Sequence, residues 1–288
     1  MGAARKYRGR IAPSPTGYLH LGHARTFWRA SERARENEGV LIFRNEDLDS
    51  QRCRPEFVQA MFEDLRWYGI GWQEGPDLGG PFGPYAQSER RRFYLDAWSK
   101  LLLGGWIYPC SCSRKDLAQA ASAPNDDNDE PVYPGTCRNQ RLAVVAPAGV
   151  NWRFRVPDGE RIEFVDLRMG ARLFVAGREF GDFVVWRRDD VPAYQLAVVV
   201  DDAAMHVSEV VRGEDLLRST ARQILLQRAL GLPTPDYYHC ALVTDDGGVR
   251  LAKRHDALSL RTLRAQGLAP GRIREMSREN FAADQCKK

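Results

Sequence analysis

The start of the chain constrains the fold most, because it alternates apolar runs with turn residues in the order strand, turn, helix, strand. Residues 8–14 have the pattern of a short strand that ends in prolines, and residues 15–17 predict a turn. Helical periodicity then runs from His20 to Asn37, and residues 40–44 form a second apolar run. Such a βαβ opening predicts an α/β fold with a parallel sheet and helices on its faces.

The rest of the chain adds helices and a β-rich segment. Helical periodicity predicts further helices over residues 54–68, 89–103 and 214–230, with one or two more from Leu258 onward. Short alternating segments between Trp152 and Trp186 predict a small antiparallel module, and residues 194–202 predict an apolar strand. We therefore expect an insertion to split the sheet. The expected parts are a first half over 1–105, an insertion over 106–190 with an acidic surface loop at 118–131, a second half over 191–245, and a loop with a helical tail over 246–288.

Composition sets further limits. With 288 residues, 43% of them hydrophobic, the chain is not intrinsically disordered. Its net charge is +4, from 42 basic and 38 acidic side chains, which permits a polyanionic partner without requiring one. No stretch approaches the ~20 apolar residues that span a bilayer, and the start lacks the apolar region of a secretory signal. We therefore expect a cytoplasmic protein with no membrane partner.

The segment His20-Leu21-Gly22-His23 follows the first strand and turn and opens the first helix. The amides and the dipole of a helix N-terminus attract phosphate, and Gly22 lets the backbone approach it. Two imidazoles three residues apart can donate to phosphate oxygens. The pattern therefore predicts an anion site, although a helix start that merely contains two histidines is an alternative.

Several separated motifs carry a family resemblance. Residues 10–17 (RIAPSPTG) closely resemble the opening of glutamyl-type class I aminoacyl-tRNA synthetases, and residues 20–23 match the HIGH signature of that class. Matches to the same subfamily follow in the same order, at residues 44–49 (RNEDLD), 194–196 (YQL) and 211–217 (VRGEDLL). The resemblance covers roughly residues 8–255. It implies a Rossmann-type catalytic domain that binds ATP at His20, Gly22 and His23.

Only 33 residues follow His255, too few for the helical anticodon-binding domain of a glutamyl-tRNA synthetase. This length, together with a cysteine cluster, resembles the family of glutamyl-queuosine tRNA(Asp) synthetases, in which the catalytic half stands alone. The resemblance implies activation of L-glutamate with ATP and Mg²⁺, transfer of glutamate to the queuosine base in the anticodon of tRNA(Asp), and a monomer. Two alternatives stay open: a truncated glutamyl-tRNA synthetase that charges tRNA(Glu), and a non-catalytic paralogue that binds glutamate or a nucleotide.

The charges of glutamate indicate which residues would bind it. Two carboxylates and one ammonium require two cations and an anion, and a guanidinium grips a carboxylate with two hydrogen bonds. Arg10 and Arg212 fit the cations, Glu46 fits the anion, and Ser14 and Tyr194 add hydroxyl groups. The resemblance implies these five positions as the glutamate site. Which arginine binds which carboxylate stays open, and a structural ion pair is the alternative for any single residue.

Cys110, Cys112 and Cys137 offer three soft metal ligands, whereas tetrahedral zinc takes four. No histidine lies between residues 24 and 205, so the fourth ligand must be another group. Tyr133 matches the position at which the family uses a tyrosine oxygen. The expectation is one structural zinc ion per chain that holds the insertion, with ordinary reduced thiols as the alternative.

The last expected element is a KMSKS-type loop over ATP, which the resemblance places at residues 250–254 (RLAKR). Lys253 keeps the catalytic lysine of the motif, so the expected catalytic residues are His20, His23 and Lys253. Ala252 and Arg254 replace both serines, which predicts an effect on loop closure and turnover. The arginines at 90–92, 187–188, 218 and 222 are candidates for RNA phosphates, with solvated helix faces as the alternative.

Overall fold

A computed structural model describes residues 6–112, 132–140, 146–243 and 259–276. The helices are α1 (Leu21–Glu36), α2 (Pro55–Tyr68), α3 (Arg91–Leu103), α5 (Tyr194–Ala204), α6 (Leu217–Leu230) and α7 (Leu260–Ala265), with short 3₁₀ turns η1 (Gln87–Glu89) and η2 (Glu214–Leu216) and a last helical segment at 270–276. The strands are β1 (Arg8–Ile11), β2 (Val40–Phe43), β3 (Ile107–Cys110), β4 (Asn151–Phe154), β5 (Arg161–Asp166), β6 (Gly170–Val175), β7 (Phe183–Trp186), β8 (Glu209–Gly213) and β9 (Asp236–Cys240).

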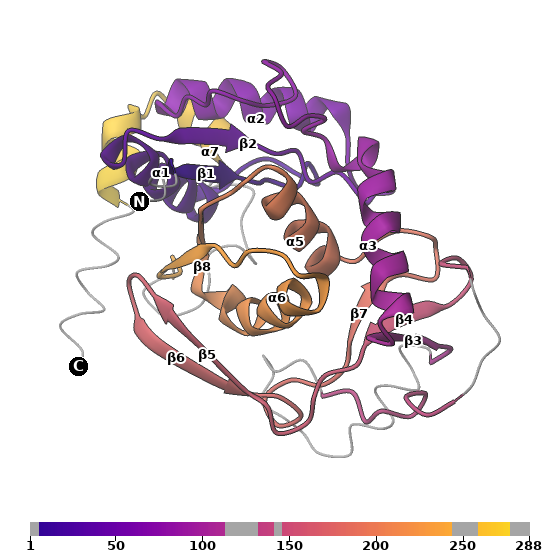
Figure 1. Ribbon diagram of the computed structural model, residues 1–288. Helices are drawn as coiled ribbons and strands as arrows, with labels where there is room; N and C mark the ends of the chain where they lie inside the picture. The colour runs from indigo at the N-terminus through magenta and orange to yellow at the C-terminus, as the bar shows by residue number, and fades with distance from the viewer. Residues whose placement is uncertain (1–5, 113–131, 141–145, 244–258, 277–288) are drawn as a thin grey trace.

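Two parallel strand pairs form the centre of the molecule (Figure 1). β1 pairs with β2 and β8 pairs with β9, both in parallel register. The amide of Ser208 donates to the carbonyl of Arg8 at 2.9 Å, which joins β8 to β1 at their starts. α1 connects β1 to β2 and packs against β1 and β8. The predicted α/β fold with a parallel sheet is therefore confirmed, although β1 ends at Ile11, ahead of Pro13, because proline cannot donate to a sheet ladder.

The segment between the two halves forms the antiparallel structure that its alternating pattern predicts. β3, β4 and β7 make one antiparallel sheet beside α3. The β5–β6 hairpin instead extends the sheet of the second half, because Asp166 of β5 pairs in parallel with Tyr237 of β9. This pairing places Asp166 beside β9 in the interior of the molecule.

The prediction of an apolar strand over residues 194–202 is wrong, because this segment is the helix α5. Every residue from Leu196 to Asp202 is buried, since α5 packs against α3, α6 and β7. A helix that is buried on all faces has no polar stripe, so its apolar run does not show a helical period. Tertiary packing here overrides the strand preference of Val198, Val199 and Val200.

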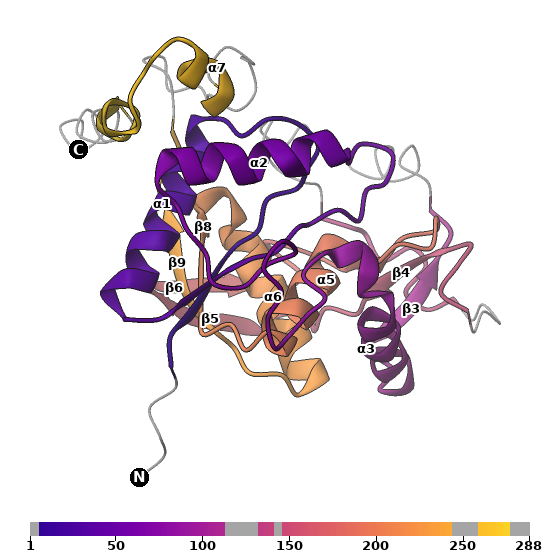
Figure 2. The same ribbon diagram turned by 90° about the horizontal axis from the view of Figure 1, so that it is seen from above.

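The other predicted helices are confirmed, and two of them begin one 3₁₀ turn later than expected, after η1 and η2. The tail contains α7, which packs against α2 (Figure 2), and the segment 270–276. Most of the apolar core lies in two clusters, one around α3, α5, α6 and the antiparallel sheet, the other around α1, α2, β1 and β2. A third, small cluster contains Tyr108, Cys110, Tyr133 and Cys137. Among the described residues, no helix is long and apolar enough to cross a membrane.

Candidate active site

A cavity of about 440 Å³ opens where β1, β8 and β9 end and α1 begins. Ligands of open α/β sheets bind at such carboxyl ends. Eight of the residues predicted to bind substrates line this one cavity: Arg10, Ser14, His20, Gly22, His23, Glu46, Tyr194 and Arg212. The chain positions from 10 to 212 are thus brought together around a volume suited to a small ligand.

Lys253 lies outside the described residues, as do Ala252, Arg254 and the acidic stretch 118–131. The described chain on either side of the KMSKS-like stretch nevertheless reaches the cavity. Val243 lines it, and Ser259 forms an antiparallel bridge with His20. Val243 and Ser259, the described residues nearest to Lys253 in the sequence, therefore both lie beside the predicted ATP residues.

His20 and His23 lie at the N-terminus of α1 with their rings stacked, 3.7 Å between centroids. Nδ1 of His20 accepts a hydrogen bond from the Gly22 amide at 3.1 Å, and Nδ1 of His23 accepts one from the His20 amide at 3.5 Å. A neutral imidazole whose Nδ1 accepts carries its proton on Nε2. Each ring can therefore donate from Nε2, as phosphate binding requires. A Cβ at position 22 would lie 3.1 Å from the His20 ring, so glycine allows this stacking.

Arg10 and Glu46 belong to a buried network of ion pairs. Nε of Arg10 lies 3.3 Å from Oδ1 of Asp202, and Nη1 of Arg10 donates to the Val211 carbonyl at 3.0 Å. Arg44 is fully buried and donates both to Asp202 at 2.6 Å and to Glu46 at 2.9 Å. Arg44 therefore fixes the carboxylate of Glu46 and, through Asp202, the guanidinium of Arg10.

These contacts shift the pKa values of both carboxyl groups. Burial raises the pKa of Glu46 above its usual range, against the attraction of Arg44. Burial acts in the same direction on Asp202, but the guanidiniums of Arg44 and Arg10 bring the pKa of that carboxyl below its usual value. Asp202 is thus held ionised beside Arg10.

Arg212 follows Val211 on β8 and is 4% exposed. Its Nη1 donates to Oε1 of Gln223 at 2.8 Å, and its Nη2 donates to Oγ1 of Thr220 at 2.7 Å. Its Nε lies 3.2 Å from Nε2 of His239. Burial and the neighbouring Arg212 lower the pKa of His239 to about 4, so this ring is neutral near pH 7. In the part of the chain that the structure describes, every hydrogen-bond partner of the Arg212 guanidinium is therefore neutral.

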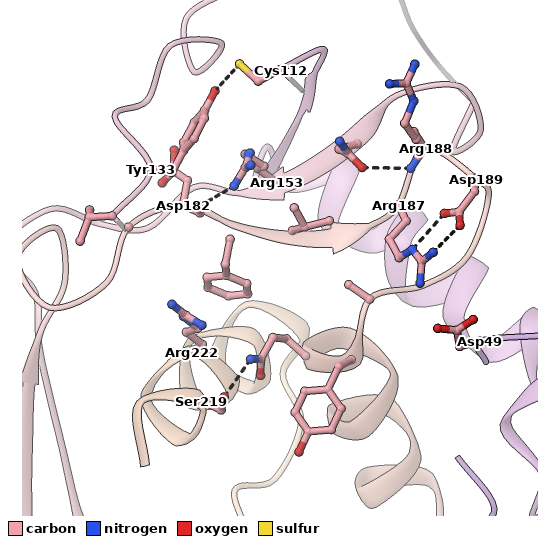
Figure 3. A pocket seen from close by; sticks show the side chains of 18 of the residues that line it. Asp49, Cys112, Tyr133, Arg153, Asp182, Arg187, Arg188, Asp189, Ser219 and Arg222 are labelled. Atoms are coloured by element: carbon pink, nitrogen blue, oxygen red, sulfur yellow. Dashed lines mark hydrogen bonds and ion pairs between the residues drawn. The ribbon is translucent and has the colours of Figure 1, made fainter. Parts of the chain in front are cut away.

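Tyr194 joins this cavity to a larger one of about 1230 Å³ between the antiparallel sheet and α6. Figure 3 shows Arg153, Arg187 and Arg188 on one wall, with Arg222 and Ser219 on the other. Arg187 is paired with Asp189, and Arg153 donates to the Asp182 carbonyl at 2.9 Å. The sequence suggested Arg187, Arg188 and Arg222 as separate contacts, and the structure gathers them around one space.

The predicted metal ligands also come together. The sulfur atoms of Cys110, Cys112 and Cys137 lie within 4.8 Å of one another. The hydroxyl of Tyr133 is 3.4 Å from Sγ of Cys110 and 3.6 Å from Sγ of Cys112. A tetrahedral zinc ion with Zn–S bonds of about 2.3 Å places its sulfur ligands about 3.8 Å apart. The donor set and its spacing therefore fit zinc.

Sequence reasoning missed the residues that hold the two arginines. Arg44 and Asp202 appeared only as members of an acidic motif and of an apolar run, and His239 and Gln223 carried no recognised motif. A pair of carboxylates directly after a buried apolar run, Asp201-Asp202, was the available signal, because buried charges require partners.

Comparisons with known proteins agree with this site. Residues 6–282 match the family model described as tRNA synthetases class I (E and Q), catalytic domain. The chain is 52% identical to a protein of Symbiobacterium thermophilum and 46% identical to one of Nitratidesulfovibrio vulgaris, both named glutamyl-Q tRNA(Asp) synthetase. These alignments cover 91% and 92% of this chain and 82% and 83% of the relatives.

More distant relatives are longer. A glutamate–tRNA ligase 2 of Nitrosococcus oceani is 43% identical over 91% of this chain and 56% of its own length. The crystal structure of a glutamate–tRNA synthetase from Elizabethkingia anophelis superimposes with a TM-score of 0.76 at 32% identity, over 91% of this chain and 54% of that one. The fold, the cavity and these similarities show that the chain belongs to the family of class I tRNA synthetases (E and Q), catalytic domain.

Proposed function

We propose that this chain is an ATP-dependent ligase that activates L-glutamate as glutamyl-adenylate and transfers it to the queuosine base in the anticodon of tRNA(Asp). The observation that carries the proposal is the single cavity that gathers two buried arginines, a buried carboxylate and two histidines at a helix N-terminus. The two relatives named glutamyl-Q tRNA(Asp) synthetase support the choice of acceptor.

The charges around the cavity favour glutamate over glutamine. Arg10, Arg44 and Arg212 contribute three positive charges, and Asp202 and Glu46 contribute two negative ones when ionised. Asp215 also lines the cavity, so the charges of this group balance before substrate binds. Glutamate is favoured because a guanidinium pairs more strongly with a carboxylate than with the amide of glutamine. In the bound state the arginines hold the carboxylates, and Glu46 accepts from the α-ammonium, with Ser14 and Tyr194 adding hydroxyl contacts.

In the first step an oxygen of the glutamate α-carboxylate attacks the α-phosphorus of ATP in line. A new P–O bond forms as the bond to the β-phosphate oxygen breaks, and pyrophosphate leaves. His20 and His23 donate from Nε2 to phosphate oxygens at the positive end of α1, and Lys253 stabilises charge on the pyrophosphate. Mg²⁺ bound with ATP neutralises phosphate charge.

In the second step a hydroxyl of the queuosine cyclopentene-diol attacks the carbonyl of the adenylate, and AMP leaves. The larger cavity offers the route for this nucleotide, because it meets the glutamate cavity at Tyr194. Arg187, Arg188 and Arg222 supply positive charge for RNA phosphates there. Cys110, Cys112, Cys137 and Tyr133 would hold a structural zinc ion, which would join the end of β3 to the chain around residue 137.

Glutamate-dependent exchange of pyrophosphate into ATP, measured without tRNA, tests the activation step. We expect exchange in the wild type and a loss of at least about 100-fold in Lys253→Ala, with glutamate binding retained, because the lysine acts on the leaving group. Unchanged exchange in this variant would show that Lys253 has another role. Exchange that requires tRNA(Glu) would favour a glutamyl-tRNA synthetase, and ATP binding without exchange would favour a non-catalytic paralogue.

A further inference from the structure

A buried carboxylate stands behind Arg212, with a histidine between them. Oδ2 of Asp166 lies 2.6 Å from Nδ1 of His239, and Nε2 of the same ring lies 3.2 Å from Nε of Arg212. Asp166 is 1% exposed and His239 is fully buried. Asp166 comes from the β5–β6 hairpin, His239 from β9 and Arg212 from β8, so three neighbouring strands contribute one residue each.

The hydrogen bonds around Asp166 determine the tautomer of His239. Oδ1 of Asp166 accepts from the amides of Arg168 at 3.0 Å and Met169 at 2.8 Å. Oδ2 accepts from the amide of His239 at 3.0 Å, in addition to its contact with the ring. A carboxylate can only accept, so the ring must carry its proton on Nδ1. Nε2 is then an acceptor, which faces the Nε–H of Arg212 at 3.2 Å and the hydroxyl of Thr220 at 3.0 Å.

We infer that Asp166 and His239 are positioning residues for glutamate binding: the carboxylate fixes the histidine tautomer, and the neutral ring then orients Arg212 toward the substrate carboxylate. This inference rests on the proposed function, since it concerns how Arg212 is presented to glutamate. It gives the β5–β6 hairpin a role in amino-acid recognition, because the hairpin supplies the carboxylate.

The neutral charge of the His239 ring is as important for glutamate binding as the orientation that the ring gives to Arg212. A carboxylate in contact with Arg212 would offset its charge and weaken its attraction for glutamate, as Asp202 does for Arg10 at 3.3 Å, whereas Asp202 acts on Arg212 without a hydrogen bond. The imidazole satisfies Nε–H without adding a negative charge, and Thr220 and Gln223 do the same for the two terminal nitrogens. The charge of Asp166 itself is taken up by three amides and the imidazole N–H, one ring away from Arg212.

Two substitutions at position 239 separate this role from a structural one. His239→Leu fills the site but removes the acceptor, whereas His239→Gln places an amide oxygen near the position of Nε2. In pyrophosphate exchange we expect His239→Leu to raise KM for glutamate about tenfold or more, with KM for ATP within about twofold of wild type. We expect His239→Gln to stay within about threefold of wild type for both substrates. His206→Leu, at an exposed histidine, is the matched control and should leave both constants unchanged.

Asp166→Asn tests the carboxylate, because an amide cannot accept at both of its heavy atoms. When its NH₂ faces the ring, Nδ1 must accept and the proton moves to Nε2, where it opposes the Nε–H of Arg212. Nitrogen-15 spectra of labelled protein report the tautomer without substrate. We expect a protonated Nδ1 and an acceptor-type Nε2 in the wild type, and a change in this assignment in folded Asp166→Asn.

The results distinguish failure of this inference from failure of the proposed function. If the wild type catalyses no exchange, the proposed function fails, and the nitrogen-15 tautomer together with calorimetric glutamate binding still decides the inference. If the wild type catalyses exchange but His239→Leu and His239→Gln keep the wild-type KM for glutamate, or if Nε2 of wild-type His239 carries the proton, the inference is overturned. Equal increases in KM for glutamate and ATP in His239→Leu would indicate a structural role and also contradict it.

Discussion

The two walls of the glutamate cavity hold their arginines in opposite ways. Arg10 is part of an ionic network, with Asp202 at 3.3 Å and Arg44 bridging to Glu46, whereas Arg212 has neutral partners in the described structure. We call Arg10, Arg44, Asp202 and Glu46 the ionic wall, and Arg212 with Thr220, Gln223 and His239 the neutral wall. Carboxylates contact the guanidiniums of the ionic wall, whereas the charge of Asp202 acts on Arg212 without a hydrogen bond. We therefore expect the ionic wall to contribute more to stability and the neutral wall more to glutamate binding.

The largest expected effect is on the ionic wall. Arg44→Met should lower the free energy of unfolding by about 3–5 kcal/mol, because it leaves Asp202, Glu46 and the nearby Asp201 buried without this guanidinium. Urea denaturation measures the change. The same experiment on Arg212→Met should give a smaller loss, since no carboxylate is left unpaired, and equal losses would remove the distinction between the walls.

The next effect concerns substrate selection. Arg212→Gln should reduce kcat/KM for glutamate about 100-fold, because a buried charge that pairs with the substrate is removed, whereas kcat/KM for glutamine should change far less. Pyrophosphate exchange with each amino acid provides the measurement. A uniform loss with both amino acids would show that Arg212 does not select charge.

Low pH should lower the free energy of unfolding through protonation of His239. The pKa of this ring is about 4 in the folded protein, below its usual 6.5, so the unfolded chain binds a proton that the folded chain does not. Stability from this group is complete above pH 6.5 and falls as the pH drops toward 4, by about 3 kcal/mol in all. Denaturation at several pH values should show a shallower acid dependence in His239→Gln than in wild type or His206→Gln. Identical slopes in all three proteins would contradict a neutral buried ring.

The smallest effect is expected from the other partners of Arg212. Thr220→Val removes the hydroxyl that accepts from Arg212 at 2.7 Å and lies 3.0 Å from Nε2 of His239, and it should cost about 2 kcal/mol of stability, with a modest rise in KM for glutamate. Thermal unfolding and exchange kinetics together check this. A loss as large as that of Arg44→Met would show that the neutral wall is a strongly coupled network.

Local sequence patterns were sufficient to predict β1, α1 and β2, and the family resemblance indicated the residues that line the cavity. The βαβ opening, the two histidines and the cysteine cluster are each made of residues that lie close together in the sequence. Their residue types and spacing were therefore enough to predict a structure or a ligand. The failure at α5 and the missed positions of Asp166 and His239 have one cause. The helix α5 and the Asp166–His239 contact both form because elements distant in the sequence pack together. An apolar run or a single histidine in the sequence does not show which residues will surround it in the fold.

The most direct test of the central claim is transfer of labelled glutamate to purified tRNA(Asp) that contains queuosine, compared with tRNA(Asp) from queuosine-deficient cells and with tRNA(Glu). We predict label on queuosine-containing tRNA(Asp) alone, after activation that needs no tRNA. Label on the 3′ end of tRNA(Glu), or equal label on tRNA(Asp) with and without queuosine, would contradict it.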